Sequence, residues 1–104
     1  MKQLKKMLKY YILKGHEIVE TDDITEWSKH FENINERIVA KTKIGDVEIS
    51  TVFLGIDHSF GGKTPIVFET MVFGGKLDQE QERYATYDEA MKGHEEMVKR
   101  VKRS

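Results

Sequence analysis

The chain has 104 residues, with 17 basic and 18 acidic side chains, one proline and no cysteine. The charges nearly cancel, so no global field would draw the protein to nucleic acid or to an anionic membrane, and without cysteine there are no disulfides, thiolate metal sites or cysteine nucleophiles. We expect one domain over residues 1–104, located in the cytoplasm, with no secretion signal and no membrane-spanning segment.

The first elements are a strand and a helix. The aromatic and β-branched run at residues 10–13 predicts a strand that ends at Gly15 and His16. Asp23 then opens a helix as its cap, with Glu26 three residues later completing a capping box. Four apolar residues share one face of this helix and should press it onto a sheet: Ile24, Trp27, Phe31 and Ile34.

The middle of the chain reads as a series of strands. Residues 37–44 alternate and predict a half-exposed strand, and residues 45–46 suit a two-residue hairpin turn. Residues 47–56 then return antiparallel as a central strand, which we expect to be covered on both faces in its second half. Another apolar strand should run from about 65 to 73, and residues 83–85 predict a further short one.

The last helix has the strongest local pattern. Thr86 and Glu89 form a capping box at its start, and Gly93 removes side-chain bulk where the helix would approach the sheet. Its apolar stripe consists of Tyr87, Ala90, His94, Met97, Val98 and Val101. Because strands and helices do not alternate regularly, we predict an α+β fold in which an antiparallel sheet of four to five strands packs against two α-helices.

Three ionisable residues are the main candidates for chemistry. The nearly uncharged stretch of residues 49–75 contains Asp57, followed by His58, and Glu69 on the next strand. A hairpin would bring the three close together, where a carboxylate and an imidazole can perform acid–base chemistry or orient a water. The structural alternative is that Asp57 and His58 bond to loop amides while Glu69 pairs with a basic residue such as Arg83.

Three further features allow two interpretations each. His94 is either a hydrogen-bonded core histidine or the partner of Glu69 in a buried pair. The sequence at 62–64 matches the end of a phosphate-binding loop, but Asp57 replaces its first glycine and a strand follows, so a flexible hairpin loop is favoured. Basic residues near both ends would bind nucleic acid if they came together: Lys2, Lys5, Lys6, Lys9, Lys99, Arg100, Lys102 and Arg103.

Several segments share one recognisable pattern. They are STVFLGIDH at residues 50–58, FETMVF at 68–73, Arg83-Tyr84, and Thr86 through to Gly93-His94. This pattern resembles a family of small uncharacterised proteins encoded by tailed bacteriophages and prophages, and it covers nearly the whole chain. The resemblance implies a phage or prophage origin and a role in the host cytoplasm, and it places the family's signature on Asp57, His58, Glu69 and Thr70. It implies no established activity.

We therefore expect a non-enzymatic binding protein of phage type, without a cofactor or a metal. Its ligand would be a host protein or a small metabolite or nucleotide held around the loop at 57–65, and homodimer formation would help to build a pocket. The candidate ligand-binding residues are Asp57, His58, Glu69, Thr70, Arg83 and His94. The alternatives are a small hydrolase using Asp57, His58 and Glu69, and a nucleic-acid accessory protein using the basic ends.

Overall fold

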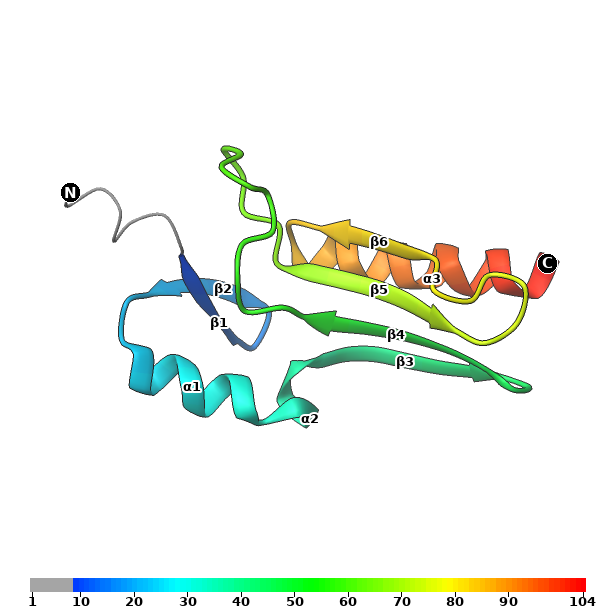
Figure 1. Ribbon diagram of the computed structural model, residues 1–104, viewed down its shortest axis with the longest axis horizontal. Coiled ribbons are helices and arrows are strands. Elements are labelled where there is room, and N and C mark those ends of the chain that lie inside the picture. Colours follow the sequence, from blue (N-terminus) through cyan, green and yellow to red (C-terminus); the bar gives the residue numbers. More distant parts are fainter. Residues whose placement is uncertain (1–8) are drawn as a thin grey trace.

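A computed structural model describes residues 9–104 and confirms the α+β fold (Figure 1). The basic residues Lys2, Lys5 and Lys6 lie outside the described residues. The elements in chain order are β1 (Tyr10–Lys14), β2 (Glu17–Thr21), α1 (Ile24–Glu32), α2 (Ile34–Arg37), β3 (Ile38–Ile44), β4 (Val47–Phe53), β5 (Phe68–Phe73), β6 (Gln81–Tyr84) and α3 (Tyr87–Arg103). They form two antiparallel sheets, a pair β1-β2 and a four-stranded sheet in the order β3-β4-β5-β6.

The strand predicted at residues 10–13 is present as β1, but the chain does not leave the sheet after it. Gly15 and His16 form a hairpin turn, with Gly15 at a φ of 63°, and residues after it return as β2, which the sequence analysis did not predict. The N–H of Tyr11 donates to Gly55 O at 2.9 Å, and Tyr10 bridges to Ile56. These bonds attach the small sheet to the chain that leaves β4.

Asp23 caps α1 as predicted, but the capping box is incomplete. The Asp23 carboxylate accepts from the N–H groups of Thr25 and Glu26 at 3.0 and 3.1 Å. The Glu26 carboxylate instead accepts from the Thr21 hydroxyl at 3.2 Å, and the Asp23 N–H donates to that same hydroxyl. The Thr21 hydroxyl lies between the Asp23 N–H and the Glu26 carboxylate because β2 leads directly into α1.

The predicted apolar face of α1 is only half correct. Trp27 and Phe31 stack with ring centroids 4.6 Å apart, but Ile24 and Ile34 are 51% and 61% exposed. The helix contacts β1 and β2 instead of lying flat on the four-stranded sheet (Figure 1). Only a narrow stripe of the helix surface is therefore covered, and the two isoleucines at the ends of the expected stripe remain exposed to solvent.

In the four-stranded sheet, β3 and β4 form the predicted hairpin around residues 45–46, and β4 is central. Ile49, Thr51 and Phe53 are buried, whereas the intervening Ser50 and Val52 are partly exposed. The expectation that the second half of β4 is covered on both faces is therefore wrong: one face is covered. The strand expected from about residue 65 begins only at Phe68, as β5.

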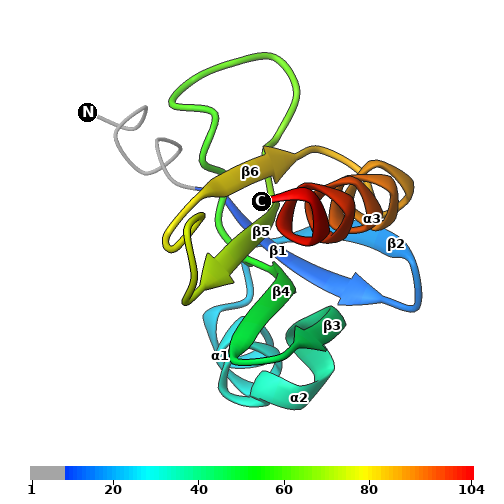
Figure 2. The same cartoon turned by 90° about the vertical axis from the view of Figure 1, so that its right-hand side faces the viewer.

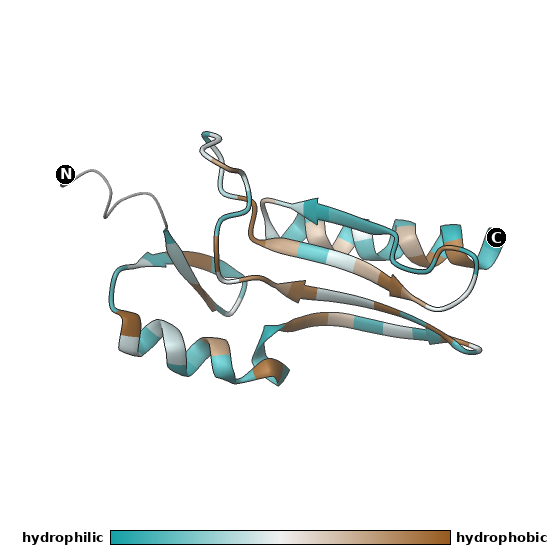
Figure 3. Ribbon diagram, in the orientation of Figure 1, coloured by the Kyte–Doolittle hydropathy of each residue, from teal (hydrophilic) through white to brown (hydrophobic). Residues whose placement is uncertain are grey.

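Helix α3 covers one face of this sheet and contacts all four strands. The Thr86–Glu89 capping box is confirmed. The core between sheet and helix consists of two clusters, one of Tyr11, Phe53, Val67, Phe68 and Ala90, and one of Ile49, Val72, Met97 and Val101. Apolar residues recur along β4 and β5, while the edge strand β6 is largely hydrophilic (Figure 3). Within residues 9–104, no helix is both long enough and apolar enough to cross a membrane.

Candidate functional site

Asp57 holds the base of the loop between β4 and β5. Its Oδ1 accepts hydrogen bonds from the backbone N–H groups of Ser59 and Ile66 at 2.8 and 2.9 Å, and its Oδ2 accepts one from the Ser59 hydroxyl at 2.9 Å. The N–H of His58 donates to Ile66 O at 2.9 Å. One carboxylate therefore ties the two stems of the loop together, as the structural alternative predicts.

The same contacts set the charge of Asp57. Burial alone would raise the pKa of this carboxyl group, but hydrogen bonds from the N–H groups of Ile66 and Ser59 and from the Ser59 hydroxyl outweigh it, so the pKa is lowered. A carboxylate that stays ionised, and whose oxygens already accept three hydrogen bonds, is poorly suited to act as a general base. Its evident task is to shape the loop.

The loop that Asp57 closes presents Phe60 to solvent. Phe60 is 90% exposed and has a φ of 55°, a conformation that costs a non-glycine residue energy. A Cβ at the neighbouring Gly61 would meet no atom within 4 Å, so the tip stands clear of the rest of the protein. The loop projects away from the sheet in both views (Figures 1 and 2). Phe60 is not among the residues predicted to bind a ligand, and its signal in the sequence is that of a lone aromatic in a loop of serine and glycine.

Glu69 does not join Asp57 at the loop. It faces Arg83 across the β5-β6 ladder, and the Arg83 Nε donates to Glu69 Oε2 at 2.9 Å. Both side chains lie on the sheet face opposite α3, because the neighbouring residues Phe68 and Thr70 are buried on the helix side. Among residues 9–104, no group of three or more His, Asp or Glu side chains is placed to hold a metal ion.

His94 lies in the core, where it bonds to two threonines and not to Glu69. Its Nδ1 is 2.7 Å from Thr51 Oγ1, and its Nε2 is 2.8 Å from Thr42 Oγ1. Thr51 in turn lies 2.5 Å from Thr70 Oγ1. The interpretation of His94 as a hydrogen-bonded core histidine therefore describes its geometry, and this polar chain spans three neighbouring strands under α3.

Burial governs the ionisation of this network. It lowers the pKa of His94, with the negative charge of Glu95 opposing the effect, so the imidazole is neutral at pH 7. Burial likewise raises the pKa of Tyr84, a change that Thr70 partly opposes. Among residues 9–104, the buried Tyr84 hydroxyl nevertheless has no hydrogen-bond partner of good geometry. The six predicted binding residues thus fall into three places: the loop, the open sheet face and the core.

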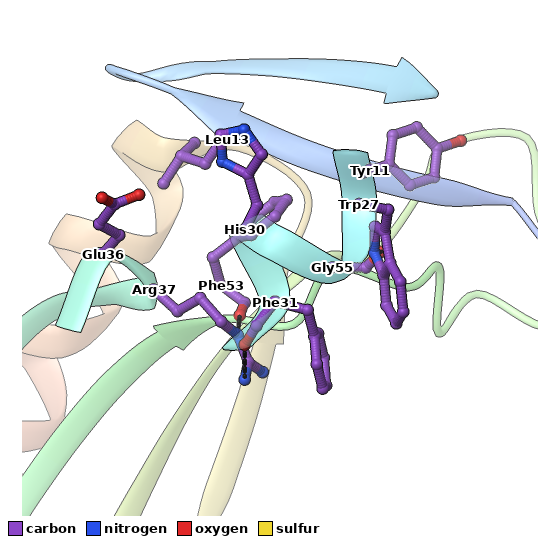
Figure 4. Close-up of a pocket in the computed structure, with 9 residues that line it drawn as sticks. All are labelled: Tyr11, Leu13, Trp27, His30, Phe31, Glu36, Arg37, Phe53 and Gly55. Atoms are coloured by element: carbon purple, nitrogen blue, oxygen red, sulfur yellow. Dashed lines mark hydrogen bonds between the residues drawn. The ribbon is translucent and has the colours of Figure 1, made fainter. Parts of the chain in front are cut away.

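A cluster of aromatic residues beside Arg37 lines a small hollow (Figure 4). The Arg37 guanidinium lies 4.0 Å from the centroid of the Phe31 ring, and its Nε donates to Phe53 O at 3.0 Å. The Trp27 Nε1 donates to Gly55 O at 3.0 Å. The cavity between these side chains has a volume of about 10 Å³, which is no larger than the space that one water molecule needs. The cluster therefore fastens α1 to the end of β4 and leaves no room for a ligand.

Comparison of the chain with models of protein families, with curated proteins and with solved structures gave no match. Interpretation of the sites therefore rests on their own geometry. Of the three places, the loop presents the most exposed large apolar side chain, Phe60, on a base tied by hydrogen bonds.

Proposed function

We propose that this chain is a non-enzymatic binding protein of phage type that docks on another protein through the loop at residues 57–65. The observation that carries the proposal is the 90% exposure of Phe60 at the tip of that loop. The phage origin rests on the resemblance at residues 50–58 and 68–73, and it makes a host-cell protein the natural partner.

Exposure of a phenylalanine side chain to water costs free energy, and this free energy is regained when the side chain is buried against a partner. Burying a phenylalanine side chain against a partner contributes about 2 kcal/mol, and aromatic anchors of this kind dominate many protein interfaces. Single exposed apolar residues are common on protein surfaces and do not by themselves mark a binding site. Phe60 combines 90% exposure with a positive φ, which adds a conformational cost.

The base of the loop is prepared for binding. Asp57 joins Ser59 to Ile66, and the Gly62 N–H donates to both the carbonyl and the hydroxyl oxygen of Ser59 at 3.3 and 3.1 Å. Such bonds reduce the number of conformations that a partner would have to freeze, which improves affinity without adding a contact. The ionised state of Asp57 at neutral pH keeps these bonds in place.

The shape of the loop favours a protein partner over a small molecule. Small-molecule sites are concave and surround most of the ligand. Around Gly61 the described residues leave open space and no enclosing wall, since a Cβ there would meet nothing within 4 Å. Glu69 is engaged with Arg83 on the sheet, so the proposal rests on the loop alone.

Affinity capture from a bacterial host lysate tests this function. Tagged wild-type protein would be compared with Phe60→Ala and with Phe73→Ala, which removes a 47% exposed phenylalanine from the sheet face. We expect a host protein that the wild type and Phe73→Ala retain and that Phe60→Ala loses. Equal capture by Phe60→Ala, or no protein above its background, would contradict the proposal. Thermal melts of all three proteins check that each is folded.

A further inference from the structure

Strand β3 is an edge of the four-stranded sheet, and a groove runs between it and α3. The groove has a volume of about 390 Å³, against about 10 Å³ for the cavity beside Arg37. Its floor is partly apolar, with Ala40 from β3 and Met91 and Val98 from α3. Within residues 9–104, no strand pairs with the outer edge of β3. This edge is therefore open to a further strand.

The two faces of that edge differ in chemistry. Ala40 and Thr42 point toward the groove, because Thr42 bonds to His94 of α3. Lys41 and Lys43 alternate with them and point to the opposite face. A strand added beside β3 would continue this alternation, with every second side chain over the apolar groove and the others beside the two lysines.

Positive charge lies on both faces of the sheet near the end of β3. Lys99 and Lys102 line the groove on α3, and Lys43 lies on the opposite face. Lys41 is 3.7 Å from Glu48, an exposed and weak pair, whereas Lys43 and Lys102 make no ion pair within the described part of the chain. Two acidic residues offset part of this charge: Lys99 is 3.6 Å from Glu96, and Glu95, which also lines the groove, lies one helical turn before Lys99 on the same side of α3.

The hairpin turn also fixes the direction of the free backbone groups. Residues 45–46 form a two-residue turn, so the flanking pair Ile44 and Val47 is a hydrogen-bonded pair of the ladder. The hydrogen-bonding direction of the backbone alternates along β3. The backbone N–H and C=O groups of Thr42 therefore face β4, whereas those of Lys41 and Lys43 face the open side of the strand. The same two residues thus offer both backbone hydrogen bonds and positive charge.

We propose that the β3 edge binds an extended segment of another protein, in which acidic and apolar residues alternate, by adding it as a fifth strand of the sheet. The apolar side chains enter the groove over Ala40, Met91 and Val98, and the acidic ones pair with Lys41 and Lys43. Strand addition of this kind takes affinity from main-chain bonds and specificity from alternate side chains.

A second copy of the chain fits this edge less well. Antiparallel pairing of β3 with itself in a register centred on Thr42 would place Lys41 of each copy opposite Lys43 of the other, and like charges across a ladder are destabilising. An acidic segment reverses the sign of that interaction. Lysines on an edge strand are a known guard against self-pairing, and here they also select the partner.

This edge lies on the opposite side of the molecule from the Phe60 loop (Figures 1 and 2). The loop leaves the sheet beyond β4 and β5, whereas β3 forms the far border of the sheet. Two partners can therefore be held at once without competing for the same surface. Occupation of β3 is independent of the loop, and a test of one proposal does not decide the other.

The test is an NMR titration of the folded protein with a short peptide of alternating Glu and Val. Controls are a peptide of the same composition in which the residues occur in pairs, an alternating Lys and Val peptide, and an oligothymidine. We expect amide shifts and new protection from hydrogen exchange at Lys41 and Lys43, with smaller changes at Met91 and Val98. Phe60→Ala should bind the alternating acidic peptide as well as the wild type does.

A charge reversal sharpens the test. Lys41→Glu/Lys43→Glu should weaken binding of the acidic peptide about tenfold and create binding of the basic one. Lys14→Glu/Lys29→Glu, which makes the same change of net charge on β1 and α1, away from the β3 edge, should leave the preference unchanged. Absence of shifts at β3, equal binding of the paired peptide, or tighter binding of oligothymidine at the same amides would overturn the proposal.

Discussion

Gly93 of α3 lies directly against the ring of Tyr84: a Cβ on Gly93 would come within 2.2 Å of the Cε1, Cζ and Oη atoms of that ring. Helix and edge strand β6 therefore approach more closely at this point than any side chain on position 93 permits. The contact also covers the Tyr84 hydroxyl, which is buried without a partner. Gly93 sets how closely α3 packs beside His94, its neighbour in the chain.

Gly93→Ala should destabilise the protein. In most helices this change stabilises by about 0.5–1 kcal/mol, since alanine loses less backbone entropy than glycine. Here the new methyl group overlaps the Tyr84 ring, and overpacking of this kind costs about 1–3 kcal/mol. Urea unfolding measures the difference. In a Tyr84→Ala background the same change should become neutral or stabilising, and a stabilising effect in the wild-type background would show that the contact is not tight.

The close approach at Gly93 belongs to the part of the fold that the sequence predicts. The capping box and apolar stripe of α3 are local patterns, and a glycine in that stripe indicates close packing wherever the helix lies. The β3-β4 hairpin is likewise local, because residues 45–46 suit only a tight turn. Such features depend on residues a few positions apart and need no knowledge of distant partners.

Other features depend on contacts that a sequence does not display. β2 was missed because Gly15 and His16 fit the end of a strand as well as a hairpin turn, and because within residues 9–104 its one strand partner is β1. The separation of Glu69 from Asp57 depends on which face of β5 meets α3. Phe60 was overlooked because an apolar residue is usually expected to be buried. Its exposure follows only from how the loop projects.

His94 should make stability depend on pH in mild acid. Burial lowers its pKa below the ordinary 6.5, so the unfolded chain takes up a proton near that pH while the folded protein resists it. The contribution of His94 to the free energy of unfolding is therefore fully present above about pH 6.5. It is lost as the pH decreases from there through the lowered pKa. His94→Gln should be less stable at pH 8 and show a flatter profile between pH 6.5 and 5.

The matched control for that profile is His30→Gln on α1, which should retain the wild-type slope. Chemical denaturation across this pH range measures both variants. A His94→Gln protein with the same slope as the wild type would mean that another group is responsible.

Asp57 should contribute to stability over a different range of pH. Its pKa is lowered in the fold, so its contribution is present above about 3.8 and is lost as the pH falls through the lowered value. At neutral pH, Asp57→Asn keeps an Oδ1 that can accept from Ser59 and Ile66 but loses the acceptor of the Ser59 hydroxyl, whereas Asp57→Ala loses all three bonds. We expect stability to decrease from wild type to Asn to Ala, with about 1–3 kcal/mol lost for Ala.

Hydrogen exchange at Ser59 and Ile66 reports this loss directly, since their N–H groups would become unprotected in Asp57→Ala. Partner capture through Phe60 should weaken in parallel, because the loop would no longer be held. Full protection of both amides in Asp57→Ala would show that the carboxylate does not hold the loop.

Glu69 and Arg83 should form a pair of small energetic weight. The Glu69 side chain is 14% exposed and that of Arg83 is 36% exposed, so solvent screens their 2.9 Å contact. Glu69→Gln and Arg83→Gln should each lower the free energy of unfolding by less than about 1 kcal/mol, and a double-mutant cycle should give a coupling that shrinks as salt is added. Partner capture through Phe60 should be unchanged in both variants. If Glu69→Gln instead kept its stability and lost the captured protein, Glu69 would belong to the binding surface, and that surface would extend from the loop onto the open face of the sheet.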